Sequence, residues 1–203
     1  MNHQLNPIHR LVSLTGGACL LFAGLATRAD DFERGGKWFD TTGGHYLTSE
    51  STEFEDGGVR GEVSLDSVYL GGLGIGYDLS DHFTLGVNVQ GGGGSIEASA
   101  GSASVSESAT FLAAGTYLDW NILKSRLTPL VSANLGFLGM SGDVGEESDS
   151  ETDFTFGVGG GLRWDMSDRW FAKALYTANW MEFEGFDELT LVHGFSLFLG
   201  YRF

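Results

Sequence analysis

Hydrophobic residues alternate with small or polar residues along most of the chain after Lys37. The C-terminal stretch 189–203 shows this best, because Leu, Phe and Tyr dominate one set of alternate positions while Gly, Ser, Thr and Arg fill most of the other. A period of two is typical of a β-strand whose two faces meet different surroundings. The pattern predicts eight strands, at about 37–48 and at 69–77, 83–90, 110–120, 129–139, 154–164, 170–181 and 189–203. In the first strand, the pattern leaves open which face is apolar.

The stretches between these strands alternate in length. Short turns rich in Asp, Ser and Asn are expected at 78–82, 121–127 and 165–169. Longer polar loops are expected at 49–62, 97–108, 143–152 and 182–188. This alternation predicts an antiparallel, up-and-down order of strands, with both ends of the chain on the side of the short turns.

The distribution of charge distinguishes two kinds of β-protein. In a soluble barrel or sandwich the apolar face of each strand points inward and the outside is charged. Here the apolar positions carry almost no charge, whereas Arg, Lys, Asn and Gln share the other face with glycine. We therefore predict an all-β, eight-stranded transmembrane β-barrel with a narrow polar interior and a lipid-facing exterior. A secreted soluble β-sandwich is the alternative.

Aromatic residues support the membrane interpretation. Most of the Trp and Tyr residues on the apolar face lie beside a short turn or the C-terminus. Trp170 and Trp180 share one face ten residues apart, which corresponds to about 25 Å along the axis of a tilted barrel, the height of an outer-membrane apolar band. We expect an interfacial girdle made of Tyr77, Trp120, Trp164, Trp170 and Trp180.

The N-terminus has the features of an export signal. Arg10 precedes an apolar run, residues 11–25, and small residues follow it, so cleavage is expected after Ala26 or Ala29. The run is shorter than the roughly 20 residues that a spanning helix needs. We predict a signal peptide at 1–29 and a barrel domain at 30–203. The only cysteine, Cys19, lies in the signal, so a disulfide framework is excluded.

Acidic residues exceed basic ones, and the net charge is −16. Loss of residues 1–29 would remove two arginines and no acid, and would change the net charge to −18. The four long stretches, counted through Asp153, carry −16 of this charge. Nucleic acid is excluded as a partner because phosphate binding needs basic patches. We expect an acidic extracellular end, with divalent cations as partners there, and periplasmic termini.

A few charged residues share the inner face of the predicted strands. They lie within a few residues of the short turns or of the C-terminus, so they should meet in one end of the lumen. A narrow lumen makes unpaired charge costly, so these side chains should form ion pairs. The predicted lumen charge cluster consists of Asp78, Asp119, Arg163, Lys173 and Arg202.

The stretch from Phe156 to Trp170 and the terminal Gly-Tyr-Arg-Phe sequence resemble small outer-membrane barrels of the outer membrane protein A transmembrane-domain type. The resemblance covers about 37–203. It implies integral location in the bacterial outer membrane, with outer-membrane lipid, lipopolysaccharide, periplasmic chaperones and the barrel assembly machinery as partners. Phe203, Tyr201 and Leu199 are similar to the C-terminal signal that this machinery reads. Such barrels serve as anchors, adhesins, small pores or lipid-modifying enzymes.

An enzymatic function is the less favoured interpretation. Lipid A deacylases of this architecture use His, Ser and an acid, and His193 and Ser196 are the candidates here. A separation of three residues places these two side chains on opposite faces of a strand, and the sequence lacks the His-x-Ser-Asn pattern of those enzymes. Within the acidic stretch 143–153, residues 149–153 are superficially similar to a calcium loop, but they lack its central glycine and its terminal glutamate at the required place.

We therefore expect no catalytic, metal or cofactor site. The predicted function is that of a structural or surface-exposed barrel with acidic loops, acting in adhesion or as a very narrow pore. A lipid A-modifying enzyme is the alternative activity.

Overall fold

The computed structural model describes residues 32–49, 51–56, 59–100, 103–144, 147–181 and 189–203. The expected signal peptide lies outside them. The described chain is all-β, and among its residues no helix is long and apolar enough to cross a membrane. The strands are β1 (Gly36–Ser49), β2 (Thr52–Asp56), β3 (Val59–Leu65), β4 (Val68–Asp78), β5 (Phe83–Ala100), β6 (Ala103–Asn121), β7 (Leu127–Val144), β8 (Glu147–Asp165), β9 (Trp170–Met181) and β10 (Thr190–Arg202).

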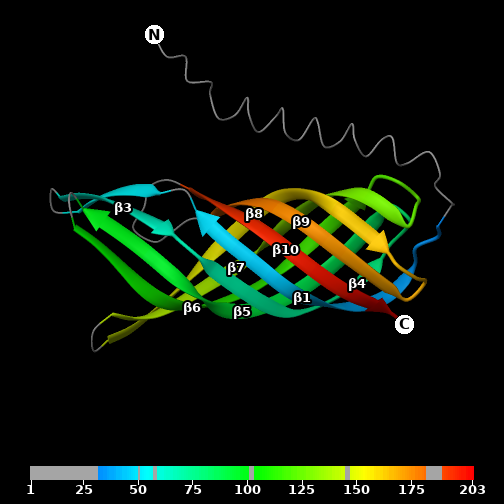
Figure 1. Ribbon diagram of the computed structural model, residues 1–203, viewed down its shortest axis with the longest axis horizontal. Helices are drawn as coiled ribbons and strands as arrows, with labels where there is room; N and C mark the ends of the chain where they lie inside the picture. Colours follow the sequence, from blue (N-terminus) through cyan, green and yellow to red (C-terminus); the bar gives the residue numbers. More distant parts are fainter. Residues whose placement is uncertain (1–31, 50, 57–58, 101–102, 145–146, 182–188) are drawn as a thin grey trace, which may run out of the picture.

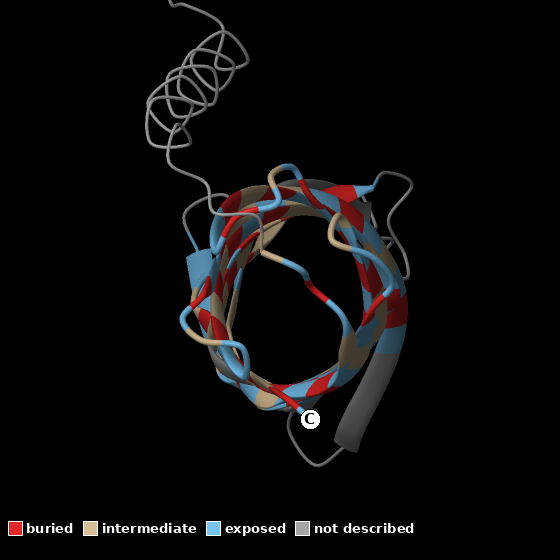
Figure 2. Cartoon of the chain, turned by 90° about the vertical axis from the view of Figure 1, so that its right-hand side faces the viewer, coloured by how far each residue is buried: buried red, intermediate tan, exposed pale blue. Residues whose placement is uncertain are grey.

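Eight of these strands form a closed antiparallel barrel, which confirms the predicted fold (Figures 1 and 2). Their order around the ring is β4, β1, β10, β9, β8, β7, β6 and β5, and the β4–β5 pairing closes it. The short β2 and β3 form a hairpin between β1 and β4, and β3 also pairs with the end of β5. Closure pairs the backbone of the barrel strands on both sides, as a membrane-spanning sheet requires.

The two ends of the barrel differ. At the end that we call the turn end, short turns join β4 to β5, β6 to β7 and β8 to β9. The C-terminus lies at this end (Figure 1), where the Phe203 amide donates to the Lys37 carbonyl at 3.1 Å. The opposite end, which we call the hairpin end, carries the β2–β3 hairpin and the far ends of the β5–β6 and β7–β8 pairs.

The expectation of polar loops at the hairpin end was largely wrong. The expected loop 49–62 contains β2 and part of β3. In the expected loop 97–108, β5 and β6 stay paired up to Ala100 and Ala103, and in 143–152, β7 and β8 stay paired up to Val144 and Glu147. The expected loop 182–188 lies outside the described residues. In these stretches, polar side chains on both faces indicate contact with water. They do not indicate the end of a strand, because a two-stranded ribbon in water is also polar on both faces.

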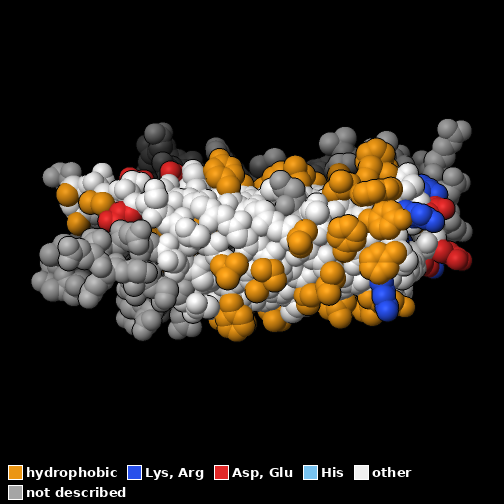
Figure 3. Space-filling model, turned by 90° about the horizontal axis from the view of Figure 1, so that it is seen from below, with side chains coloured by type: hydrophobic (Ala, Val, Ile, Leu, Met, Phe, Trp, Pro, Cys, Tyr) orange, Lys and Arg blue, Asp and Glu red, His pale blue; other side chains and the backbone are white. Residues whose placement is uncertain are grey.

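The outside of the barrel is apolar, as predicted, but the inside is polar only in part, because large apolar side chains are buried there beside the charged and polar ones. Leu73, Ile75, Val87 and Val89 are exposed on the outer wall, whereas the alternate positions are glycine or are less exposed. Figure 3 shows hydrophobic side chains spread over the wall, with Lys and Arg at the turn end. Such an exterior suits lipid rather than water.

The ambiguous face of the first strand has a physical cause. A register shift against both neighbours lies between Thr42 and His45. Before it the even-numbered Trp38 and Asp40 point into the barrel, and after it the odd-numbered Leu47 is buried. A bulge of this kind reverses the alternation within one strand.

Candidate functional site: the barrel lumen

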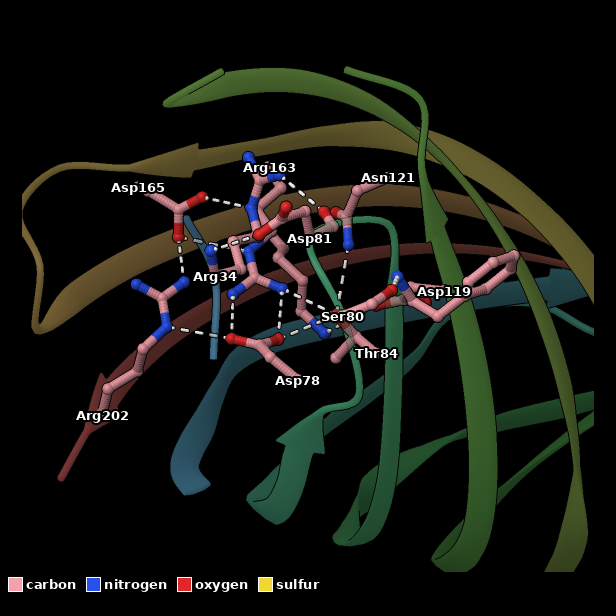
Figure 4. Close-up of polar contacts among 12 residues, drawn as sticks. Arg34, Asp78, Ser80, Asp81, Thr84, Asp119, Asn121, Arg163, Asp165 and Arg202 are labelled. Atoms are coloured by element: carbon pink, nitrogen blue, oxygen red, sulfur yellow. Dashed lines mark hydrogen bonds and ion pairs between the residues drawn. The ribbon is translucent and has the colours of Figure 1, made fainter. Parts of the chain in front are cut away.

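The lumen at the turn end is filled by buried ion pairs (Figure 4). Arg163 on β8 forms two hydrogen bonds to Asp78 on β4, Nη1 to Oδ1 at 3.0 Å and Nη2 to Oδ2 at 3.1 Å. Arg202 on β10 donates from Nε to Asp78 Oδ2 at 3.0 Å. Thr84 donates to Asp78 Oδ1 at 2.8 Å. The Asp78 carboxylate is therefore fully engaged by groups from three other strands.

Asp165 is a second anionic centre of this layer. Its Oδ1 accepts hydrogen bonds from Arg163 Nε at 3.3 Å and from Arg202 Nη2. Its Oδ2 accepts from Arg34 Nε at 2.8 Å, and Arg34 lies before β1. The side chains of Arg34, Arg163 and Asp165 are fully shielded from solvent. Such pairs are stable only because nearly every charge is matched.

A second charged group lies around Lys173 on β9. Its Nζ contacts Asp119 Oδ2 at 3.3 Å and Asp40 Oδ2 at 3.9 Å. Tyr117 links the three, because its hydroxyl accepts from Lys173 Nζ at 3.2 Å and donates to Asp40 Oδ2 at 3.2 Å. The ammonium also lies over the rings of Tyr117 and Phe198, 4.4 and 4.6 Å from their centroids. One cation thus bridges two carboxylates on different strands.

Aromatic rings pack between these charges. Trp38, Tyr117 and Phe171 form a buried cluster, in which the Trp38 ring stacks on Tyr117 and meets Phe171 edge-on. Gly76 and Gly200 make room for it, because a Cβ atom there would collide with Trp38 or Phe171. The inner-face glycines therefore allow large rings to fit inside a narrow barrel.

A cavity of about 110 Å³ lies farther along the lumen, and its largely apolar wall carries a few polar side chains. His45 Nδ1 lies 2.7 Å from Gln90 Oε1 at its wall. His45 Nε2 and Ser132 Oγ are buried and have no hydrogen-bond partner among the described residues. The walls also carry the side chains of Asn134 and Thr177. The space beside these polar atoms is large enough for a few water molecules, which would pair with them.

An apolar cluster lies toward the hairpin end of the lumen. Its side chains come from seven strands and are at most 5% exposed. It packs against Ile96 and Met140, which extend it toward the hairpins. The members are Leu47, Leu65, Val68, Leu70, Phe111, Leu138, Met181 and Val192. The interior of the described barrel thus contains ion pairs, aromatic rings, a cavity with a few polar side chains, and an apolar cluster.

The structure buries all five residues of the predicted lumen charge cluster, but divides them between two groups. Asp78, Arg163 and Arg202 share one, and Asp119 and Lys173 share the other. Sequence reasoning missed Arg34, Asp40 and Asp165. Asp165 lies two residues after Arg163 and therefore on the same face of the strand, which could have identified it as a lumen residue. Asp165 was assigned to the expected turn instead. Asp40 was missed because the face of the first strand was ambiguous.

The candidate catalytic pair is separated. Ser196 is 2% exposed on the inner face and lies beside His45 in the register of β1 and β10. His193 lies on the outer face, where its Nδ1 is 2.7 Å from the Tyr176 hydroxyl and its ring stacks on that tyrosine. Glu182, Glu184 and Glu188, the acidic residues nearest to this pair in the sequence, lie outside the described residues. In the described part of the chain, no group of three or more His, Cys, Asp or Glu side chains could hold a metal ion.

The residues of the predicted girdle lie on the outer wall. Tyr77, Trp120, Trp164 and Trp170 are exposed next to the turn end, whereas Trp180 lies farther along β9 and stacks on Phe156 at 5.7 Å. The expected assembly-signal residues also face outward. Phe203 and Leu199 are exposed, and the ring of Tyr201 packs edge-on against Trp170 at 5.0 Å.

Comparison with known proteins agrees with this architecture. Residues 17–203 match the family described as outer membrane protein beta-barrel domain. A search of curated proteins gave no matching sequence.

Several solved barrels share the fold. Neisserial surface protein A is 15% identical with a TM-score of 0.62, and the match covers 82% of this chain and 97% of that one. The outer membrane protein OprG from Pseudomonas aeruginosa is 12% identical with a TM-score of 0.59, over 85% and 98% of the two chains. The attachment invasion locus protein of Yersinia pestis, solved with the heparin analogue sucrose octasulfate, is 15% identical with a TM-score of 0.52, over 84% and 99%.

Proposed function

Because the chain belongs to the outer membrane protein beta-barrel domain family, we propose that it is a non-enzymatic surface protein that attaches to its partners through the hairpin end. The observation that carries this proposal is a contrast between the two regions of the barrel. Side chains block the lumen on both sides of its cavity, at the ion pairs and at the apolar cluster, whereas paired strands continue beyond the ring at the hairpin end. The hairpin end is thus the larger surface open to partners.

The blocked lumen argues against the alternative of a narrow pore. An ion crossing the barrel would meet the Arg163–Asp78 pair, the Lys173 group and then the apolar cluster. Eight strands enclose just enough space for side chains. Ion conduction would require the Arg163–Asp78 pair, the Lys173 group and the apolar cluster to move at the same time.

The β5–β6 hairpin supports binding of an extended polypeptide. β6 pairs with β5 from Ala103, but its pairing with β7 among the described residues begins only at Ala109. Residues 103–108 are exposed and contain neither Lys nor Pro, the residues that usually protect a free strand edge. An added strand could pair there through backbone hydrogen bonds. The acidic surroundings favour a basic partner.

Orientation follows from how far the chain extends beyond the ring at each end, because the β5–β6 and β7–β8 hairpins continue past the ring whereas the turns at the other end are short. Outer-membrane barrels keep short turns in the periplasm and long loops outside, so the turn end and both termini would face the periplasm. The acidic hairpin end would then meet anionic lipopolysaccharide, and divalent cations would bridge the two. The exposed Phe203 would remain available to chaperones and the assembly machinery during insertion.

Two measurements on the purified barrel in lipid vesicles test this function. We expect no stepwise conductance in a planar bilayer, and saturable binding of reduced, alkylated lysozyme, which is an unfolded basic polypeptide. Ser106→Lys should weaken this binding by protecting the β6 edge. Met166→Lys makes a matched charge change at the turn end and should leave binding unchanged. Regular conductance steps, or equal binding by both variants, would contradict the proposal.

A further inference from the structure

A short segment before β1, residues 32–35, crosses the mouth of the barrel at the turn end (Figure 2). It places Arg34 inside the mouth with only 5% of the residue exposed. The Phe32 amide donates to the Lys124 carbonyl at 3.0 Å. The Phe32 ring lies under the guanidinium of Arg126 at 4.6 Å and near that of Arg202 at 5.6 Å. The segment is therefore tied to the turn end at more than one point.

The Arg34 guanidinium is surrounded by acceptors from two of the short turns and from Asp165 at the end of β8 (Figure 4). Its Nη1 donates to the carbonyl of Asp81 at 2.9 Å and to that of Leu123 at 3.0 Å. Its Nη2 donates to the carbonyl of Ser125. Its Nε donates to the Asp165 carboxylate at 2.8 Å. Four hydrogen bonds thus use four acceptors on separate residues.

Charge balance alone does not explain this arrangement. Without Arg34, two arginines, Arg163 and Arg202, would still face two aspartates, Asp78 and Asp165. The backbone carbonyls of the turns are neutral, and they are the acceptors that Arg34 specifically satisfies. Their spacing fits a planar fork of N–H donors, whereas a compact ammonium group could not reach all of them.

We propose that the turn-end mouth is a guanidinium-binding site, which Arg34 fills from within the chain, and that segment 32–35 thereby forms a plug over the lumen. The ligand class is an alkylguanidinium cation. Two turns and the end of β8 fix the acceptors from outside the segment, so the site should persist when the Arg34 side chain is removed.

Chemical rescue of an Arg34→Ala variant tests this site. The variant in detergent should lose its folded gel mobility at a lower temperature than the wild type. Millimolar ethylguanidinium should restore at least half of that loss in a saturable manner. Ethylammonium, a cation of equal charge without the planar fork, should restore much less. Arg126→Ala removes an exposed guanidinium and should gain nothing from ethylguanidinium.

A direct binding measurement separates rescue from general effects of salt. In the Arg34→Ala barrel, ethylguanidinium should shift the amide NMR signals that follow the carbonyls of Asp81, Leu123 and Ser125. If the variant does not fold alone, refolding it with ethylguanidinium should give a higher folded yield than refolding it with ethylammonium. Equal effects of the two cations, in stability or in yield, would overturn the proposal.

Discussion

Arg163 and Asp78 join opposite walls of the barrel, although they are 85 residues apart in the sequence. The two side chains form a bidentate pair with distances of 3.0 and 3.1 Å, and both are fully shielded from solvent. Their strands, β8 and β4, lie half-way around the ring from each other. The pair therefore braces the barrel across its full width.

Replacement of Arg163 by Met should strongly destabilise the barrel. Asp78 would keep Arg202 but lose its bidentate partner in a shielded site, and breaking such a pair costs about 3–5 kcal/mol. The free energy of unfolding in urea from lipid vesicles measures this loss. Arg169→Met removes an exposed arginine and should cost less than about 1 kcal/mol. Equal effects of the two changes would show that the cross-lumen pair is not a brace.

The Lys173 group offers a second test of lumen packing. Lys173→Met leaves Asp119 and Asp40 facing each other's charge without the cation between them, so we expect a loss of about 3 kcal/mol or more. The exposed ion pair of Lys124 with Asp81 at 2.8 Å provides the control, because Lys124→Met should have a small effect. A Lys173 variant as stable as wild type would indicate that these carboxylates reach solvent.

Inner-face and outer-face glycines should respond differently to an added methyl group. At Gly200 a Cβ atom would collide with the buried Phe171 ring, so Gly200→Ala should cost about 1–3 kcal/mol. At Gly160 the nearest atom to a Cβ is 3.8 Å away, so Gly160→Ala should be nearly neutral or slightly stabilising. Thermal unfolding of the two variants compares them. A larger loss at Gly160 would contradict the assignment of faces.

The sequence was sufficient to predict strand faces wherever two solvents impose a strict period of two. The alternation does not indicate the faces of the first strand, where the bulge near Thr42 reverses the period. It also ends beyond the ring, where no face of the hairpins is apolar. The β5–β6 hairpin shows the second case, because its residues 103–108 are exposed in alternate and adjacent positions alike.

The candidate site was predictable only in part, for a related reason. The alternation of positions along a strand identifies which charged side chains face the lumen, and it identified Arg163 and Lys173. It carries no information about a residue outside the strands, such as Arg34, whose position depends on how segment 32–35 crosses the mouth. Side-chain pairing across the ring is likewise set by strand tilt and register, which the alternation does not encode.

The plug should respond to acid through Asp81. Its carboxylate accepts from the Arg34 amide at 2.9 Å, and the hydrogen bond from Lys124, together with that amide, lowers the pKa of Asp81 below its ordinary value of 3.8. Because the pKa of Asp81 is lower in the folded protein, the contact stabilises the fold at every pH above the ordinary pKa of the carboxyl. This stabilisation is lost as the pH falls through the lowered pKa. The amide NMR signal of Arg34 should therefore stay unchanged from neutral pH to about pH 4 and shift only below it.

Asp81→Asn is the matched control for this titration. The amide oxygen can still accept from Arg34, but it does not titrate, so the shift at low pH should disappear. A shift of the Arg34 signal near neutral pH, or one that persists in the variant, would show that another group controls the plug.

Accessibility of the two barrel ends on living cells tests the central claim most directly. The predicted mature chain contains no cysteine, so Ser106→Cys on the hairpin end and Met166→Cys at the turn end would each provide a single thiol. On intact cells a bulky maleimide–polyethylene glycol should label Ser106→Cys, and it should label Met166→Cys only after the outer membrane is permeabilised. Labelling of Met166→Cys on intact cells, or of neither variant before permeabilisation, would contradict a surface-exposed hairpin end.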